Sequence, residues 1–152
     1  SSWDGPGDRA FCSCIATARS GKSHRMERFF WICLAGALGT GTRYLVGFWG
    51  EDRLGSPFPY GTLVVNVVGC FLIAAVMQAA LLIATFPPTL RIALTTGFLG
   101  GLTTYSSFAY ETTKLAQSGA RASALSNFGL TTIVCFGAVL LGLAAARAFV
   151  KA

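Results

Sequence analysis

Charged residues are scarce in this 152-residue sequence: they make up 12% of it, about half the share found in a typical soluble domain. The apolar stretches contain no acidic pair, no histidine and no cluster of metal ligands. The residues that acid/base catalysis by paired carboxylates and metal-assisted hydrolysis require are therefore missing from these stretches. We do not expect an enzyme. The net charge of +6 comes from Lys and Arg scattered at the ends of the apolar stretches, without a basic face. We therefore expect no nucleic-acid partner.

The five cysteines do not follow the pattern of a disulfide framework. Cys33, Cys70 and Cys135 lie inside apolar stretches, where cysteine behaves as a small buried hydrophobe. The pair Cys12 and Cys14 is compatible with a metal, although only His24 lies nearby.

Long apolar runs dominate what is present, since 53% of the residues are hydrophobic. A helix that spans a bilayer needs roughly 20 mostly apolar residues. Four windows meet this length, at about 29–49, 60–85, 89–116 and 122–150. The sequence therefore predicts an all-α, multi-pass membrane protein of four transmembrane helices in the lipid bilayer. These helices form one transmembrane domain over residues 26–152.

Residues 1–25 are polar and rich in glycine and serine, and Met26 opens directly into the first apolar window. We expect Met26 to be the biological start. Residues 1–25 are then a disordered or non-native extension, from upstream translation or an expression vector. An organelle transit peptide is the alternative, given the arginines and serines.

The third window carries an unusual stretch at 97–108, with adjacent Gly100 and Gly101, then two threonines, then Tyr105 and Phe108 with serines between them. Glycine weakens a helix, and backbone freed at membrane depth survives only where protein buries it or where it lines a cavity or binds an ion. The stretch predicts a third helix broken at its centre, at a functional site. A helix-packing surface is the alternative, because Gly97 and Gly101 also form G-x-x-x-G.

Polar residues are few in the other three windows. Asn66 either forms a hydrogen bond between helices or supplies an NH2 donor that faces a pore. Arg43 either extends to the membrane interface, which we favour slightly, or meets a water-filled vestibule. Asn127, Thr131 and Cys135 follow one another at i, i+4 and i+8, which places a weakly polar stripe on one face of the last helix.

Lys and Arg are nearly balanced between the two sides of the membrane, when the loops are counted from Met26. An excess of these residues normally marks the cytoplasmic side. The balance therefore predicts a weakly determined orientation, so that the chain could pair with an inverted copy of itself.

The available chemistry is that of neutral groups: hydroxyls, one amide, ring edges and backbone carbonyls. Hydroxyl and amide donors bind an anion, and aromatic edges add their positive rim. Carbonyls freed at a helix break bind a small cation such as Na+. Without a mid-membrane Lys or Arg, a small anion held by neutral donors can bind and still leave.

Three segments, 36–44, 61–66 and 96–108, together with Glu111, resemble the CrcB/Fluc family of fluoride channels. The resemblance runs from about Met26 to the C-terminus. It implies a fluoride-selective channel that exports fluoride passively across the cell (inner or plasma) membrane and so limits its toxicity. It also implies an antiparallel, dual-topology homodimer with two pathways at the interface.

The resemblance further assigns roles to individual residues. It implies that Asn66 is the pore amide, that Tyr105 and Phe108 meet fluoride with their ring edges, and that hydroxyls come from Ser106, Ser107 and Thr131. The backbone carbonyls of Gly100 and Thr103 would hold a structural Na+ at the dimer centre. Glu111 would lie toward a pore mouth. Tyr105 stands where the family usually has phenylalanine, and Cys135 where serine often occurs.

Two other classes of protein remain open from the residues alone. A dual-topology exporter of the small multidrug type needs a membrane-embedded carboxylate, and the first helix has none beyond Glu27 at its edge. A non-transporting membrane scaffold would use Gly97 and Gly101 for packing only, and Asn66 as a link between helices.

Overall fold

The computed structural model describes residues 6–54 and 58–151, and it places side chains within 24–50 and 58–150. Every regular element of this part of the chain is helical, as predicted. The elements are α1 (Pro6–Leu54), α2 (Tyr60–Leu82), α3 (Pro88–Ile92), the π-helix η1 (Ala93–Leu99), α4 (Gly100–Leu102), α5 (Tyr105–Gln117) and α6 (Arg121–Lys151).

Three of the described helical stretches are long and apolar enough to cross a membrane: His24–Gly50, Tyr60–Leu82 and Arg121–Val150. Large apolar side chains are exposed along them, among them Leu38, Leu81 and Phe136. In water such a surface would be unfavourable, whereas lipid or another apolar partner accommodates it. The chain is therefore a membrane protein. The third predicted window, 89–116, is divided into α3, η1, α4 and α5, and the count of four spanning helices stays a prediction.

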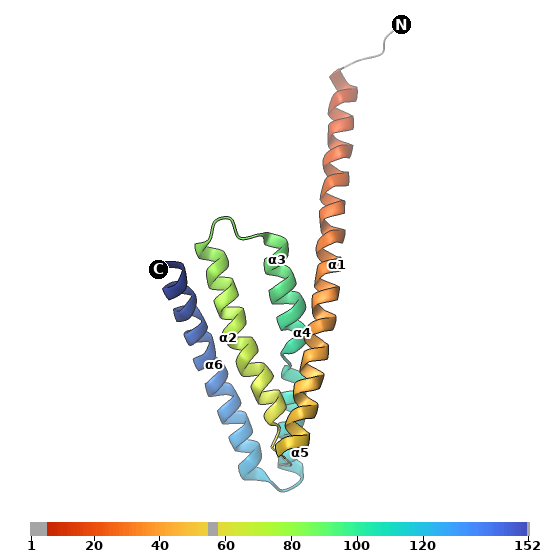
Figure 1. The fold of residues 1–152 in the computed structure, drawn as a ribbon. Coiled ribbons are helices and arrows are strands. Elements are labelled where there is room, and N and C mark those ends of the chain that lie inside the picture. The colour runs from red at the N-terminus through yellow and green to blue at the C-terminus, as the bar shows by residue number, and fades with distance from the viewer. Residues whose placement is uncertain (1–5, 55–57, 152) are drawn as a thin grey trace.

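The helix α1 begins at Pro6 and projects well beyond the ends of the other helices (Figure 1). Of the predicted extension 1–25, residues 1–5 lie outside the described part, and the rest is helical and continuous with the first span. That residues 1–25 stand apart from the channel domain stays a prediction.

Two pairs of segments make up the bundle. The helices α2 and α6 run side by side in the same direction, and α1 runs opposite to them alongside the segment from α3 to α5 (Figure 1). Val65 of α2, Leu99 of η1 and Leu102 of α4 form a buried apolar cluster. The divided segment is thus held between α1 and α2.

Close packing of α1 on the divided segment depends on glycine. A Cβ atom at Gly39 would overlap the carbonyl group of Phe98, and it would lie 3.0 Å from the backbone nitrogen of Leu102. These are backbone atoms, which cannot move aside as a flexible side chain does. Gly41, two residues further along α1, has nothing within 4 Å of the same position.

We expect Gly39→Ala to destabilise the protein by about 1 to 3 kcal/mol, the usual cost of overpacking a tight contact. Gly41→Ala should leave stability unchanged or raise it slightly, because alanine favours helix. Thermal unfolding of the purified variants in detergent measures both. Equal unfolding temperatures for the two variants would show that α1 at Gly39 is not in tight contact with the backbone of Phe98.

Candidate functional site

The divided segment is interrupted at its centre by two extended residues. The helix α4 ends at Leu102, and α5 begins at Tyr105. Between them Thr103 has φ −83° and ψ 151°, and Thr104 has φ −149° and ψ 114°. The predicted break is confirmed, two residues after the adjacent glycines.

The side-chain amide of Asn66 on α2 satisfies the backbone exposed by this break. Its Nδ2 donates to the carbonyl oxygen of Thr104 at 3.1 Å, and its Oδ1 accepts from the Thr104 N–H at 2.8 Å. Asn66 is 8% exposed and Thr104 is 6% exposed. Both backbone groups of Thr104 would otherwise be buried without a partner, which is costly at membrane depth.

Thr104 also starts the next helix. Its Oγ1 accepts from the Ser107 N–H at 3.2 Å, as an N-cap does, and donates to the Ser107 hydroxyl at 3.1 Å. The Ser106 hydroxyl lies 3.2 Å from the same oxygen. The hydroxyls of both serines therefore gather around Thr104.

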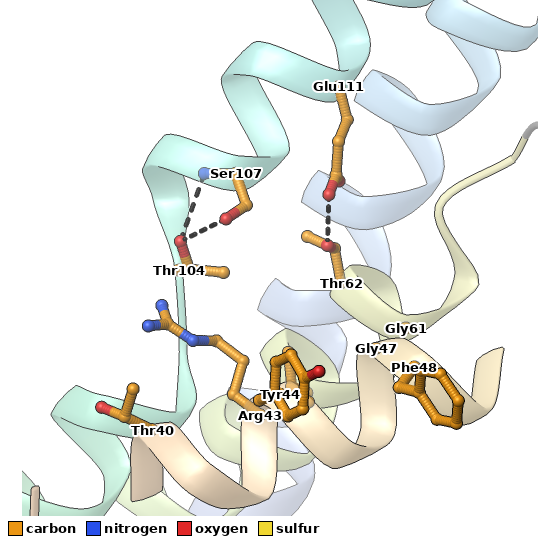
Figure 2. Close-up of a pocket in the computed structure, with 11 residues that line it drawn as sticks. Thr40, Arg43, Tyr44, Gly47, Phe48, Gly61, Thr62, Thr104, Ser107 and Glu111 are labelled. Atoms are coloured by element: carbon orange, nitrogen blue, oxygen red, sulfur yellow. Dashed lines mark hydrogen bonds between the residues drawn. The ribbon is translucent and has the colours of Figure 1, made fainter. Parts of the chain in front are cut away.

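One cavity lies on the Glu111 side of the break and is called here the Glu111 cavity. Its volume is about 470 Å³, and it lies between α1, α2, Thr104 and α5 (Figure 2). Arg43 extends into it from α1, toward Thr104. The Thr62 hydroxyl donates to Glu111 Oε1 at 2.8 Å across it. Its full lining is Thr40, Arg43, Tyr44, Gly47, Phe48, Gly61, Thr62, Val65, Thr104, Ser107 and Glu111.

A second cavity, of about 290 Å³, lies on the other side of Thr104 and is called the Phe108 cavity. Tyr105 and Phe108 both line it, with ring centroids 5.7 Å apart and planes tilted by 56°. Phe108 is 6% exposed, whereas Tyr105 is 79% exposed. The full lining is Asn66, Cys70, Thr103, Thr104, Tyr105, Phe108, Thr131, Thr132, Cys135 and Phe136.

The polar stripe of α6 connects to α5 through a chain of hydrogen bonds. The Thr131 hydroxyl donates to Asn127 Oδ1 at 3.2 Å, and Asn127 Nδ2 donates to the Thr112 hydroxyl oxygen at 2.8 Å. The Thr112 hydroxyl in turn donates to the Phe108 carbonyl at 2.7 Å. Asn127 is 1% exposed and lies outside the lining of the Phe108 cavity, so its amide fixes Thr131 against α5.

This geometry can be compared with known proteins. The family described as CrcB-like protein, Camphor Resistance (CrcB), matches residues 30–143, a stretch that includes the break and both cavities. The chain belongs to the CrcB family. Relatives named fluoride-specific ion channel FluC support this. The one from Sorangium cellulosum is 48% identical over 122 residues, which is 80% of this chain and 96% of the relative. The one from Citrifermentans bemidjiense is 44% identical over 123 residues, or 81% and 99%.

Four of the six predicted fluoride-pore residues meet in this CrcB chain, together with Thr103 of the predicted Na+ site. Asn66, Tyr105, Phe108 and Thr131 all line the Phe108 cavity. The two predicted serines are placed differently: Ser107 lines the Glu111 cavity, and Ser106 lines neither cavity. Of the two serines, only Ser107 therefore borders a cavity, and that cavity does not contain Tyr105 or Phe108.

Sequence reasoning missed Thr104 as a site residue, although it is the residue common to both cavities. A signal for it was present, because threonine directly before a helix is a preferred N-cap. For Arg43 the sequence slightly favours a position at the membrane interface. In the structure Arg43 is half-buried and lines the Glu111 cavity. Its placement matches the vestibule alternative.

Proposed function

We propose that this chain is a fluoride-selective channel that lets fluoride leave the cell passively and so limits its toxicity. The observation that carries the proposal is the Phe108 cavity, where an amide and two aromatic rings meet at a helix break. One N–H of the Asn66 amide is used by Thr104, and an amide has two, so the second remains for an anion. The ring edges of Tyr105 and Phe108 add positive rims.

Selectivity follows from the nature of these donors. Fluoride holds its water tightly, so a pore has to replace that hydration with groups at close range. A rigid site built from backbone-tethered Asn66 and a buried ring suits a small anion better than the larger chloride. The donors are neutral, so a bound ion is not trapped as it would be beside a buried lysine or arginine. The family relatives named as fluoride-specific channels support the same substrate.

A dual-topology drug exporter is the alternative from the sequence, and the carboxylates argue against it. Glu27 is exposed near the start of the span His24–Gly50, and its Oε2 lies 3.7 Å from His24 Nδ1. Glu111 accepts a hydrogen bond from Thr62 and lies in the Glu111 cavity, away from the ring pair. Neither carboxylate lies in the Phe108 cavity, where a drug cation would meet aromatic walls. The relation to the CrcB family also disfavours the exporter.

The partner we propose is a second copy of the chain in inverted orientation in the plasma membrane. Two observations support it: the near balance of Lys and Arg between the two sides, and the exposure of Tyr105 although it belongs to the cavity lining. A second copy would cover Tyr105. The thiol introduced by Lys114→Cys, in a chain otherwise free of cysteine, should react with a membrane-impermeant maleimide from both sides of the membrane. Labelling from one side alone would disprove the inverted arrangement.

A structural Na+ is proposed at the dimer centre, held by the backbone carbonyls of Gly100 and Thr103. The break supports this choice, because the Thr104 N–H donates to Asn66 rather than to the Gly100 carbonyl. That carbonyl thus loses the usual i to i+4 partner. One chain supplies only two such oxygens, so a second copy is needed to complete the set. Reconstitution in choline without Na+ should lower efflux, and efflux indifferent to Na+ would count against the site.

Fluoride efflux from liposomes that contain the purified protein tests the channel. A fluoride electrode should record rapid release, while a chloride electrode on matched liposomes records retention. Proton-coupled drug efflux without fluoride release would favour the exporter. The absence of flux of any ion from well-folded protein would favour the scaffold.

A further inference from the structure

Two cysteines on different helices line the Phe108 cavity, one on α2 and one on α6. Cys70 and Cys135 both line this cavity, and both are free and half-buried. The two thiols are close enough to interact across the cavity. Neither thiol has a part in the fluoride site proposed above.

The packing of the two helices holds this pair in place. A Cβ atom at Gly142 of α6 would overlap the carbonyl of Phe71, the residue after Cys70, and would lie 3.1 Å from the Ala74 Cβ. The two backbones are thus in close contact one residue from Cys70 on α2 and seven residues from Cys135 on α6. A ligand that joins the sulfur atoms therefore has to fit between two helices whose spacing is fixed at this contact.

We propose that Cys70 and Cys135 form a two-sulfur site for a soft divalent cation of the mercuric type. Thiolates prefer soft metals. Among the described residues no group of three or more Cys, His, Asp and Glu side chains comes together, so a four-ligand zinc site is not available. A mercuric ion is satisfied by two sulfur ligands in a line.

Charge favours a divalent ion over a monovalent one at this place. Two thiolates and one divalent cation give a neutral product, whereas silver(I) or copper(I) would leave a negative charge beside Phe108 and Phe136. Mercuric chloride is itself neutral, so it reaches the cavity without crossing as a cation. Both S–H bonds and both Hg–Cl bonds break, two Hg–S bonds form, and two protons and two chloride ions leave. No atom changes oxidation state.

Occupation of this site would obstruct the cavity that contains Asn66 and Phe108. Mercury should therefore block fluoride efflux, a consequence that rests on the proposed function. Binding of the metal itself does not depend on that function, so the two can be tested separately.

The test uses the full chain with its other three cysteines replaced, as Cys12→Ser, Cys14→Ser and Cys33→Ser. This background protein in liposomes is treated with mercuric chloride and then washed with an excess of 2-mercaptoethanol. A single protein thiol loses its mercury to 2-mercaptoethanol during the wash. A pair of thiols retains the ion because two Hg–S bonds hold it. We expect one mercury retained per chain, measured by atomic absorption.

Adding Cys70→Ser or Cys135→Ser to the background should lower the retained mercury at least tenfold, and restoring Cys33 should not raise it. Background protein that retains no mercury after the wash would overturn the proposal, as would two mercury ions per chain, which would mean that the thiols act independently. Mercury should block fluoride efflux through the background protein. It should leave fluoride efflux through the Cys70→Ser and Cys135→Ser proteins unchanged. If untreated protein shows no fluoride efflux, the channel function fails, while mercury retention still decides the site.

Discussion

Phe108→Ile should reduce fluoride efflux at least about a hundredfold, which corresponds to about 2.7 kcal/mol of added barrier. Phe108 is buried, lines the Phe108 cavity and lies 5.7 Å from Tyr105, centroid to centroid. Isoleucine fills much of the same volume but has no ring edge, so an anion loses its positive rim at this point. The measurement is the initial rate of fluoride release from liposomes with equal amounts of protein.

The neighbouring ring provides a matched control. Phe128 stacks on Phe108 with centroids 6.2 Å apart and planes at 20°, but it does not line the cavity. Phe128→Ile removes the same ring atoms one layer away from the proposed path. It should leave efflux within a few-fold of the unchanged protein. If both variants conduct equally well, the ring of Phe108 has no part in conduction. If both variants lose flux, conduction requires the stacking of Phe108 on Phe128 rather than the ring edge of Phe108.

The break could be predicted from the sequence because several local signals agree there. Adjacent glycines weaken the helix, and Thr104 is a favoured N-cap. Long apolar windows likewise predicted the spans of α2 and α6, with ends within a few residues of those observed. Both are properties of a short stretch of chain, which a sequence displays directly.

Which side of the break each side chain faces could not be predicted in the same way. Ser106 and Ser107 follow Tyr105 in sequence, and the resemblance implies that they supply hydroxyls along the pore. In the structure their hydroxyls turn to Thr104, because the cap of α5 satisfies backbone and hydroxyl groups together. Cys70 and Cys135 are also far apart in sequence, and they line one cavity because α2 packs on α6. Apolar periodicity alone does not encode that register.

Asn66→Ala should destabilise the protein by about 2 to 6 kcal/mol, because it leaves two buried backbone groups of Thr104 unpaired at about 1 to 3 kcal/mol each. Those groups now bond the Asn66 amide at 2.8 and 3.1 Å. Thermal unfolding in detergent measures the loss. The control is Gln78→Ala, a second side-chain amide on α2 that lies outside both cavities. It should change the unfolding temperature little.

Fluoride efflux of the same variants separates the two roles of Asn66. The amide oxygen and one N–H hold the break, and only the second N–H is left for an ion. Asn66→Ala removes all three, so efflux should fall to the rate of protein-free liposomes even in the folded fraction. Lost stability with efflux retained would mean that Asn66 acts only on the backbone. Lost efflux with unchanged stability would mean that Thr104 finds other partners. Loss of both is expected, because the amide that closes the broken helix is also the one that faces the ring pair.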